Sequence, residues 1–140
     1  DNSGMKLSTR SRYGIRALLD LAMNSGDKPV SINEIARRQG ISPRYLENIF
    51  HVLRTAGVLG SSKGKGGGFY LSKSLKEISV LNIIDILDGE LSIIDCIEHG
   101  EDCSRAGECY TRVMWEKLNQ DIRNAFSDVN LEDVFGSIKK

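Results

Sequence analysis

The sequence predicts a mainly α-helical fold with one small β-hairpin, and three observations carry this prediction. Apolar residues recur at three- and four-residue spacing along several segments of the 140-residue chain, as they do in amphipathic helices. Two helical segments are separated by a tight turn at Gly40. The stretch KGKGGGFYL, residues 63–71, then runs from glycines into aromatic residues that favour strands.

The first two predicted helices precede that turn. The segment from Thr9 to Ser25 carries one apolar stripe, and Gly26 follows it as a stop signal. The second helix is short and ends at Gly40. Its first residues, SINE at 31–34, predict a capping box in which Ser31 accepts a hydrogen bond from the backbone three residues on, while Glu34 reaches back.

The third predicted helix follows a two-residue turn and is closed by Gly57. Ser42 suits the N-cap position, and Pro43 suits the first helical position. One side of this helix is apolar and the opposite side is polar: Leu46, Ile49, Phe50 and Leu53 form the first, and Arg44, Asn48 and His51 the second. A short helix, a tight turn and a second helix with a hydrogen-bonding face form a helix-turn-helix pattern.

Two strands, VLGSS at 58–62 and GFYLSK at 68–73, are predicted on either side of the glycine-rich loop. A flexible linker would lack the Phe69–Leu71 run, and a phosphate-binding loop would be followed by a helix. A hairpin after a helix-turn-helix predicts a winged helix. Its glycines allow a tight tip with positive φ, which places Lys63 and Lys65 where phosphates or a minor groove would lie.

The C-terminal half is predicted to contain two more helices. Ser79 is a plausible N-cap for a helix that ends at Gly89, and residues 90–108 are predicted to form a loop. A helix of roughly 20 residues, about 30 Å long, is predicted from Cys109 onward. Its apolar stripe consists of Tyr110, Met114, Leu118, Ile122 and Phe126. Little of the chain remains to cover this stripe, so we expect the same helix of a second copy to cover it in a homodimer.

The net charge is zero, but the charges are unevenly distributed. Residues 1–70 hold 11 Lys/Arg and 5 Asp/Glu, whereas residues 71–140 hold 8 and 14. This asymmetry indicates a basic module that meets phosphate and an acidic module with another role, or else two solvated faces of one fold. No run approaches the roughly 20 apolar residues of a membrane span, and no nucleophile is paired with a base. We therefore expect neither a membrane partner nor an enzyme.

The polar side of the third helix suits double-stranded DNA. Arg44 can pair bidentately with guanine, and Asn48 can pair with adenine. Ser42 and Tyr45, near the helix N-terminus, can hold phosphate or base edges. Phosphate would repel Glu47 unless its carboxylate accepts a hydrogen bond from a cytosine amino group.

Two plainer interpretations stand beside this one. Arg44 and Glu47 alone would form an ordinary surface pair worth about 0.3 kcal/mol. His51 is as well explained as a surface histidine as by a phosphate contact. The helix-turn-helix spacing together with the wing favours DNA binding.

Three cysteines, Cys96, Cys103 and Cys109, fall within 14 residues, and the chain has no others. Three thiolates this close can converge on a soft metal, although a structural zinc site or a 2Fe–2S cluster needs a fourth ligand. An odd number of cysteines favours a reduced, cytoplasmic setting over a disulfide framework. The alternative is three unrelated thiols, one of them redox-reactive.

Several segments together resemble one known family. They are MKLSTRSRYGIRALLDLA, ISPRYLENIFHVLRTAGVLGSSKGKGGGFYL and the cysteine triplet before VMWEKL. They resemble the IscR family of iron–sulfur-cluster-sensing regulators of cluster assembly genes. This family belongs to a winged-helix superfamily that also contains the nitric-oxide sensor NsrR. The similarity extends from Met5 to about Phe135.

The resemblance implies a homodimer whose long helices cross and whose winged helices each bind half of a palindromic operator. It implies a 2Fe–2S cluster held by Cys96, Cys103 and Cys109, with the cluster state selecting the operator through Glu47. The family's histidine ligand corresponds here to Arg112, whose guanidinium has no free lone pair. We expect His99 as the fourth ligand, and the alternatives are Glu98, Glu101, Asp102, Glu108 or a residue of the partner's first helix. In the wing, Lys65 replaces the usual proline.

The sequence thus predicts a cluster-sensing repressor of iron–sulfur assembly genes. A nitric-oxide or redox sensor of the same fold and a thiol-switch interaction module are the alternatives. Residues 1–4 resemble a tag remnant, and residues 5–75 are expected to form the winged-helix DNA-binding domain. Residues 76–108 would hold the connecting helix and cluster-binding loop, and residues 109–140 the dimerisation helix and a C-terminal tail.

Overall fold

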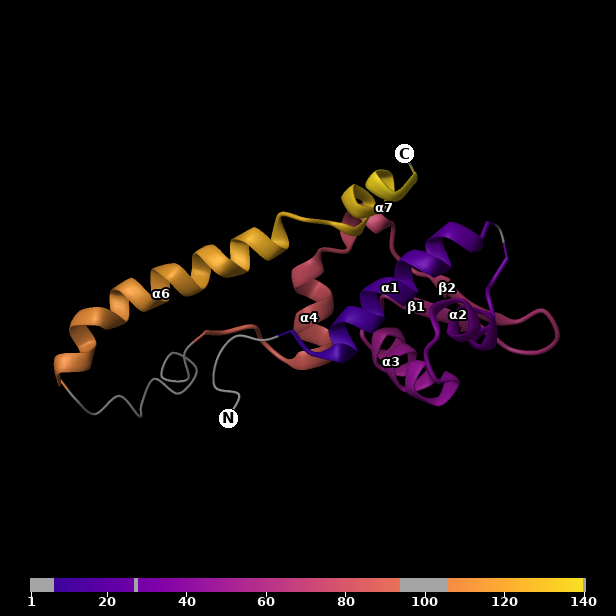
Figure 1. Cartoon of the computed structure of the whole chain (residues 1–140), viewed down its shortest axis with the longest axis horizontal. Helices are drawn as coiled ribbons and strands as arrows, with labels where there is room; N and C mark the ends of the chain where they lie inside the picture. Colours follow the sequence, from indigo (N-terminus) through magenta and orange to yellow (C-terminus); the bar gives the residue numbers. More distant parts are fainter. Residues whose placement is uncertain (1–6, 27, 94–105, 140) are drawn as a thin grey trace.

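Three helices and a hairpin in the N-terminal half form a winged helix (Figure 1). The computed structural model describes residues 7–26, 28–93 and 106–139. In chain order the first elements are α1 (Thr9–Asn24), α2 (Ile32–Gln39), α3 (Pro43–Thr55), β1 (Leu59–Ser62) and β2 (Gly68–Leu71). They are followed by the short 3₁₀-helix η1 (Leu75–Glu77), α4 (Val80–Asp88), α6 (Ala106–Ser127) and α7 (Leu131–Lys139). The predicted fold class is confirmed.

Serine hydroxyls cap several of these helices, as the local sequence predicts. Each accepts a hydrogen bond from the backbone N–H three residues on, at 3.1, 3.2, 3.2 and 3.0 Å for Ser8, Ser31, Ser42 and Ser79. The capping box predicted at Ser31 is half formed, because the Glu34 carboxylate turns to Arg38 Nη1, 3.6 Å away. A complete box forms at Ser79, whose N–H donates to Asn82 Oδ1 at 3.3 Å.

The hydrophobic core lies between α1, α3, α4 and the hairpin. The predicted apolar side of α3 supplies Phe50 and Leu53, both fully buried, and α1 supplies Leu18 and Leu21. The hairpin joins this core through Phe69, whose ring meets the Phe50 ring edge-on at a centroid distance of 5.1 Å. The position of the wing is therefore coupled to the position of α3.

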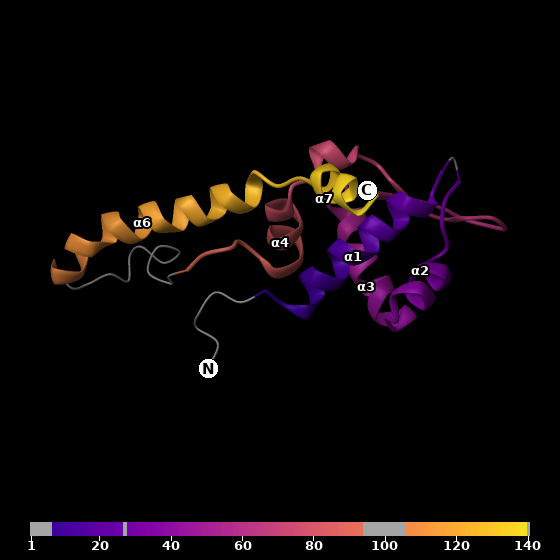
Figure 2. The same cartoon turned by 45° about the horizontal axis from the view of Figure 1, so that its top comes forward.

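The helix α6 extends from this body as an arm in both views (Figures 1 and 2). It begins at Ala106 rather than at Cys109, and its 22 residues are about 33 Å long. Its C-terminal part packs Ile122 and Phe126 against apolar residues of α4 and Leu91. Farther out, its large apolar side chains are exposed: Val113, Met114, Trp115 and Leu118.

A helix forms where the sequence suggested only a tail. Asn130 and Asp133 cap the start of α7 reciprocally, with Asp133 N–H donating to Asn130 Oδ1 at 2.9 Å. Leu131 is fully buried in the main core, and its N–H donates to the Ile78 carbonyl at 2.9 Å. The chain thus returns from α6 to the body of the domain.

Candidate nucleic-acid interface

The polar side of α3 and the hairpin form the walls of an open hollow. Its lining consists of Arg44, Glu47, Asn48, His51, Arg54 and Phe69. Four α3 residues predicted to contact DNA are exposed and share this one concave surface: Arg44, Glu47, Asn48 and His51. The structure therefore brings together the set that the helical spacing indicated.

Arg44 and Glu47 do not form the surface pair that was the plainer interpretation. Across the described residues, the ion pairs include neither side chain. Both charges face the hollow. Within the described residues, neither the Arg44 guanidinium nor the Glu47 carboxylate has a charged partner, so both can bind a polar ligand that enters the hollow.

Arg54 is a feature of the hollow that sequence reasoning missed. Its Nη1 donates to Ser61 Oγ of β1 at 3.0 Å, and its Nη2 lies 3.4 Å from His51 Nδ1. The guanidinium therefore spans from α3 to the wing and adds a fixed positive charge between them. Arg54 lies one turn after His51 on the polar side of α3, and this spacing could have predicted that it belongs to the same surface.

Ser42 and Tyr45 have structural roles at the start of α3. Ser42 Oγ accepts a hydrogen bond from Tyr45 N–H as the N-cap. The Tyr45 ring is half-buried and meets the Tyr13 ring of α1 edge-on at a centroid distance of 5.9 Å. The ring contact holds the N-terminal end of α3 against α1.

The wing presents the two predicted lysines at its tip. Lys63 and Lys65 are exposed and alternate with Gly64 and Gly66, whose φ angles of 89° and 81° require glycine. The base of the wing is anchored, since Phe69 and Val30 exchange backbone hydrogen bonds of 2.8 and 2.9 Å. The predicted tight tip with positive φ is confirmed.

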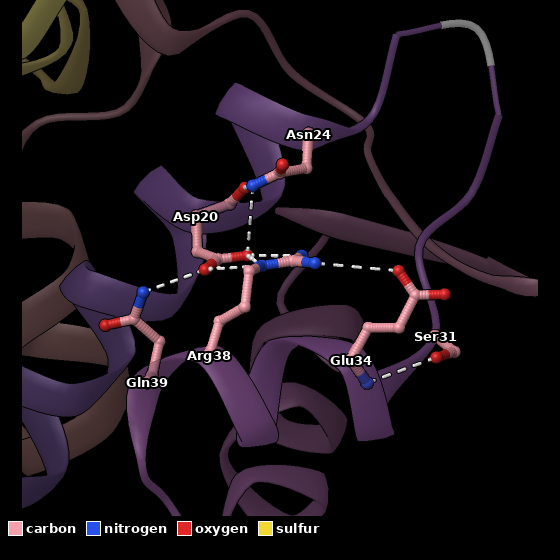
Figure 3. A network of polar contacts seen from close by, with 6 residues as sticks. All are labelled: Asp20, Asn24, Ser31, Glu34, Arg38 and Gln39. Atoms are coloured by element: carbon pink, nitrogen blue, oxygen red, sulfur yellow. Dashed lines mark hydrogen bonds and ion pairs between the residues drawn. The ribbon is translucent and has the colours of Figure 1, made fainter.

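A buried carboxylate, that of Asp20, joins α1 to α2 (Figure 3). Asp20 accepts hydrogen bonds from Arg38 Nη2 at 2.7 Å, from Arg38 Nε at 3.1 Å and from Gln39 Nε2 at 2.8 Å. The Asp20 side chain is only 3% exposed. Arg16 also ties α1 to the end of α2, because its Nη2 donates to the Gln39 carbonyl at 2.6 Å. The turn before α3 is thereby fixed.

The charge state of Asp20 follows from these contacts. Burial alone would raise the pKa of Asp20, but the hydrogen bonds from Arg38 and Gln39 outweigh it and hold the pKa below its usual value. The pKa of Arg38 is raised by the same pair. Asp20 is therefore ionised at neutral pH.

The predicted metal ligands lie outside the part of the chain whose side chains the structure describes. Cys96, His99 and Cys103 fall within 94–105, and of Cys109 only the backbone, in the first turns of α6, is described. Among the described residues, no three His, Cys, Asp or Glu side chains lie close enough together to hold a metal ion. Arg112 Nε donates to Glu116 Oε2 at 3.1 Å, so the two residues form an ion pair along α6.

Comparison with known proteins decides the family. The model of the Rrf2 family, described as iron-dependent transcriptional regulators, matches residues 7–137. The chain belongs to the Rrf2 family. Among its Rrf2 relatives are protein rrf2 of Nitratidesulfovibrio vulgaris, 40% identical over 93% of this chain and 87% of that protein, and the regulator IscR of Vibrio atlanticus, 37% identical over 93% and 75%. The predicted resemblance to IscR is confirmed.

Solved structures of Rrf2-like regulators have the same fold. IscR of T. potens is 34% identical with a TM-score of 0.72, covering 96% of this chain and 89% of that one. CymR of B. subtilis, the global cysteine regulator, is 28% identical with a TM-score of 0.78, covering 95% and 98%. The chain is thus a DNA-binding transcriptional regulator of the winged-helix type and not an enzyme.

Within the described residues, no helix is both long and apolar enough to cross a bilayer.

Proposed function

We propose that this Rrf2-family regulator is an iron–sulfur-cluster sensor that represses cluster assembly genes in the cytoplasm. The observation that carries the proposal is the placement of three cysteines, and no others in the chain, directly before and within the start of α6. Both the family's description as iron-dependent and the similarity to proteins named IscR support it.

The DNA-reading part of the proposal rests on the hollow between α3 and the wing. Arg44 and Asn48 would contact base edges in the major groove, with Glu47 selecting cytosine. Lys63 and Lys65 at the wing tip would bind phosphate or enter the adjacent minor groove, and His51 would contact phosphate. Ser42 and Tyr45 would add contacts at the helix N-terminus.

The proposed homodimer rests on the exposed apolar residues of α6. Val113 is 72% exposed and Leu118 42% exposed, whereas Ile122 and Phe126 on the same helix are covered by α4. Contiguous exposed apolar surface on a helix marks an interaction site. A second α6 related by two-fold symmetry would cover it and would pair two winged helices on a palindromic operator.

The cofactor proposed is a 2Fe–2S cluster held by Cys96, Cys103, Cys109 and a fourth ligand, for which we propose His99. The donor set fits, since thiolates and imidazole are the ligands of such clusters. When bound, the cluster would supply an iron centre whose loss reports on cluster supply. The chain's own part is to link the cysteine segment to α6 at one end and to α4 at the other, so that holding the thiolates shifts the population of winged-helix arrangements.

Anaerobic purification followed by a visible spectrum and iron and sulfide analysis tests the cofactor. We expect a coloured protein with both elements bound, and we expect Cys103→Ala to lose the colour while retaining the circular dichroism of a folded winged helix. A colourless, iron-free wild-type protein after reconstitution would contradict the proposal.

A second candidate is a nitric-oxide sensor of the same fold. Arg112 stands where the resembled family has its histidine ligand, and this departure favours a differently held cluster. Titrating nitric oxide against the loaded protein and measuring operator release separates the two. Release at stoichiometric nitric oxide would favour the second candidate, whereas release only on removal of the cluster would favour the first.

A further inference from the structure

The C-terminal half of the arm α6 is joined to the body of the domain by polar contacts at three levels, beside the packing of Ile122 and Phe126 against α4. The first is its C-terminal end, where Val80 N–H donates to the Val129 carbonyl and Leu131 N–H donates to the Ile78 carbonyl, both at 2.9 Å. The second is a polar clamp about one turn before the end of α6, formed by Arg123, Asp85 and Leu91. The third lies one turn farther out, where Ile93 N–H donates to Asn119 Oδ1 at 2.8 Å. A rod held at one end can pivot, whereas a rod held at several points has a fixed direction.

The clamp is closed by four hydrogen bonds. Arg123 Nη2 donates to Asp85 Oδ2 at 3.0 Å, and Arg123 Nη1 donates to Asp85 Oδ1 at 3.3 Å and to the Leu91 carbonyl at 3.0 Å. Leu91 N–H donates to Asp85 Oδ1 at 3.0 Å. The side chains of Arg123 and Asp85 are only 20% and 29% exposed. Because Arg123 donates to three acceptors in a half-buried site, its side chain is fixed in one orientation relative to α4.

A small change of angle at this clamp would displace the far end of α6 by several ångströms. Arg123 lies 17 positions after Ala106, a distance of about 25 Å along the helix. A pivot of about 10° at Arg123 therefore moves the far end by about 4 Å, which is roughly the rise of one base pair. The exposed apolar residues Val113, Met114, Trp115 and Leu118 all belong to this outer part of α6.

We propose that the Arg123–Asp85 clamp sets the direction of α6 relative to α3, and thereby the separation of the two half-sites that the dimer accepts. This inference rests on the proposed homodimer joined through α6. Arg123 and Asp85 are positioning residues for operator recognition, acting at a distance from the DNA and without touching it.

A set of DNA duplexes tests the clamp in the full chain. Half-sites obtained by selection with the wild-type chain are placed as inverted repeats, with their separation varied one base pair at a time, and also as single half-sites. The variant Arg123→Met keeps the length and apolar stem of the side chain and removes the three hydrogen bonds. Lys117→Met is the matched control, because the Lys117–Asp121 pair lies on the same helix at 3.0 Å, is 74% and 51% exposed, and does not reach α4.

We expect the wild type and Lys117→Met to prefer one separation. For Arg123→Met, we expect affinity for a single half-site to stay within about twofold, while preference for the best separation over its neighbours falls by about threefold or more. Asp85→Asn keeps the side-chain shape and the oxygen that accepts from Leu91 N–H, and it should likewise weaken the preference for one half-site separation. This variant replaces Arg123→Met in the test if Arg123→Met does not fold.

Three results would overturn the inference. One is an unchanged separation profile in a folded, dimeric Arg123→Met or Asp85→Asn protein. Another is an equal loss at every separation and at the single half-site, because the clamp would then only stabilise the domain. If the wild type shows no preference for any inverted repeat over a single half-site, the proposed dimeric reading fails together with this inference, and that result is distinct from the other two.

Discussion

Arg38 and Asp20 form an ion pair, with Arg38 Nη2 2.7 Å from Asp20 Oδ1 and the Asp20 side chain only 3% exposed. The pair joins α2 to α1, and Gln39 and Asn24 complete the hydrogen bonds of the carboxylate (Figure 3). Because α3 begins a few residues after Gln39, this pair fixes the turn from which α3 starts.

Replacing Asp20 by Asn is expected to destabilise the protein by about 2 kcal/mol, since the guanidinium of Arg38 loses its charged partner in a half-buried site. Urea unfolding followed by circular dichroism measures the change. Glu34→Gln is the matched control, because Glu34 lies 3.6 Å from the same arginine but is 55% exposed. We expect that variant to stay within about 0.5 kcal/mol of wild type. Equal effects of the two variants would contradict the assigned role.

The pH dependence of stability follows from the lowered pKa of Asp20. A carboxyl whose pKa is lower in the folded than in the unfolded protein stabilises the fold fully above its unfolded pKa, and this contribution is lost as pH falls through the folded value. The stability difference between wild type and Asp20→Asn should therefore be constant near pH 7 and shrink below about pH 4. A difference that grows on acidification would show the opposite sign of the pKa shift.

Gly68 is expected to tolerate no side chain. A Cβ at this position would overlap the backbone carbonyl of Val30, with which Phe69 forms the bridge that anchors the wing. Gly68→Ala should cost about 2 kcal/mol and loosen the wing, with faster amide exchange at Phe69. Gly66→Ala is the comparison, since its Cβ meets open space and only its positive φ costs about 1 kcal/mol. If Gly66→Ala proves the more harmful, the wing is not anchored at Val30.

The wing lysines should act through phosphate rather than through base sequence. Lys63→Ala and Lys65→Ala are each expected to weaken binding uniformly across operator variants and to lower the salt dependence, the slope of log K against log salt, by about 1. Binding measured by fluorescence anisotropy at several salt concentrations gives this slope. A change in base preference with an unchanged slope would assign the lysines to base contacts instead.

Local chemistry made much of this molecule predictable from sequence. Ser42 and Pro43 predict the start of α3, where they occupy the N-cap and the first helical position. Gly40, with φ of 67°, ends α2, and Gly64 and Gly66 form the tip of the wing. Each of these features depends on a few neighbouring residues. Spacing along α3 also placed Arg44, Glu47, Asn48 and His51 on one side, and they do line one hollow.

Contacts between distant segments could not be predicted in the same way. Asp20 lies on an apolar helix face, and its partner Arg38 is 18 residues away, so nothing in either local pattern identifies the pair. Arg54 reaches Ser61 across a turn, and Arg123 reaches Asp85 from another helix 38 residues away. The helix α7 was predicted only as a tail, because its stability depends on a distant contact: Leu131 is buried in the main core.

Selection from a random pool of DNA duplexes, with anaerobically reconstituted and metal-stripped protein in parallel at one salt concentration, tests the central claim most directly. If the cysteine segment controls how the two winged helices bind, the two forms will enrich different sets of sequences, and Cys103→Ala will enrich the metal-stripped set under both conditions. Identical enrichment by both forms would show that DNA choice is independent of any cofactor held by these cysteines.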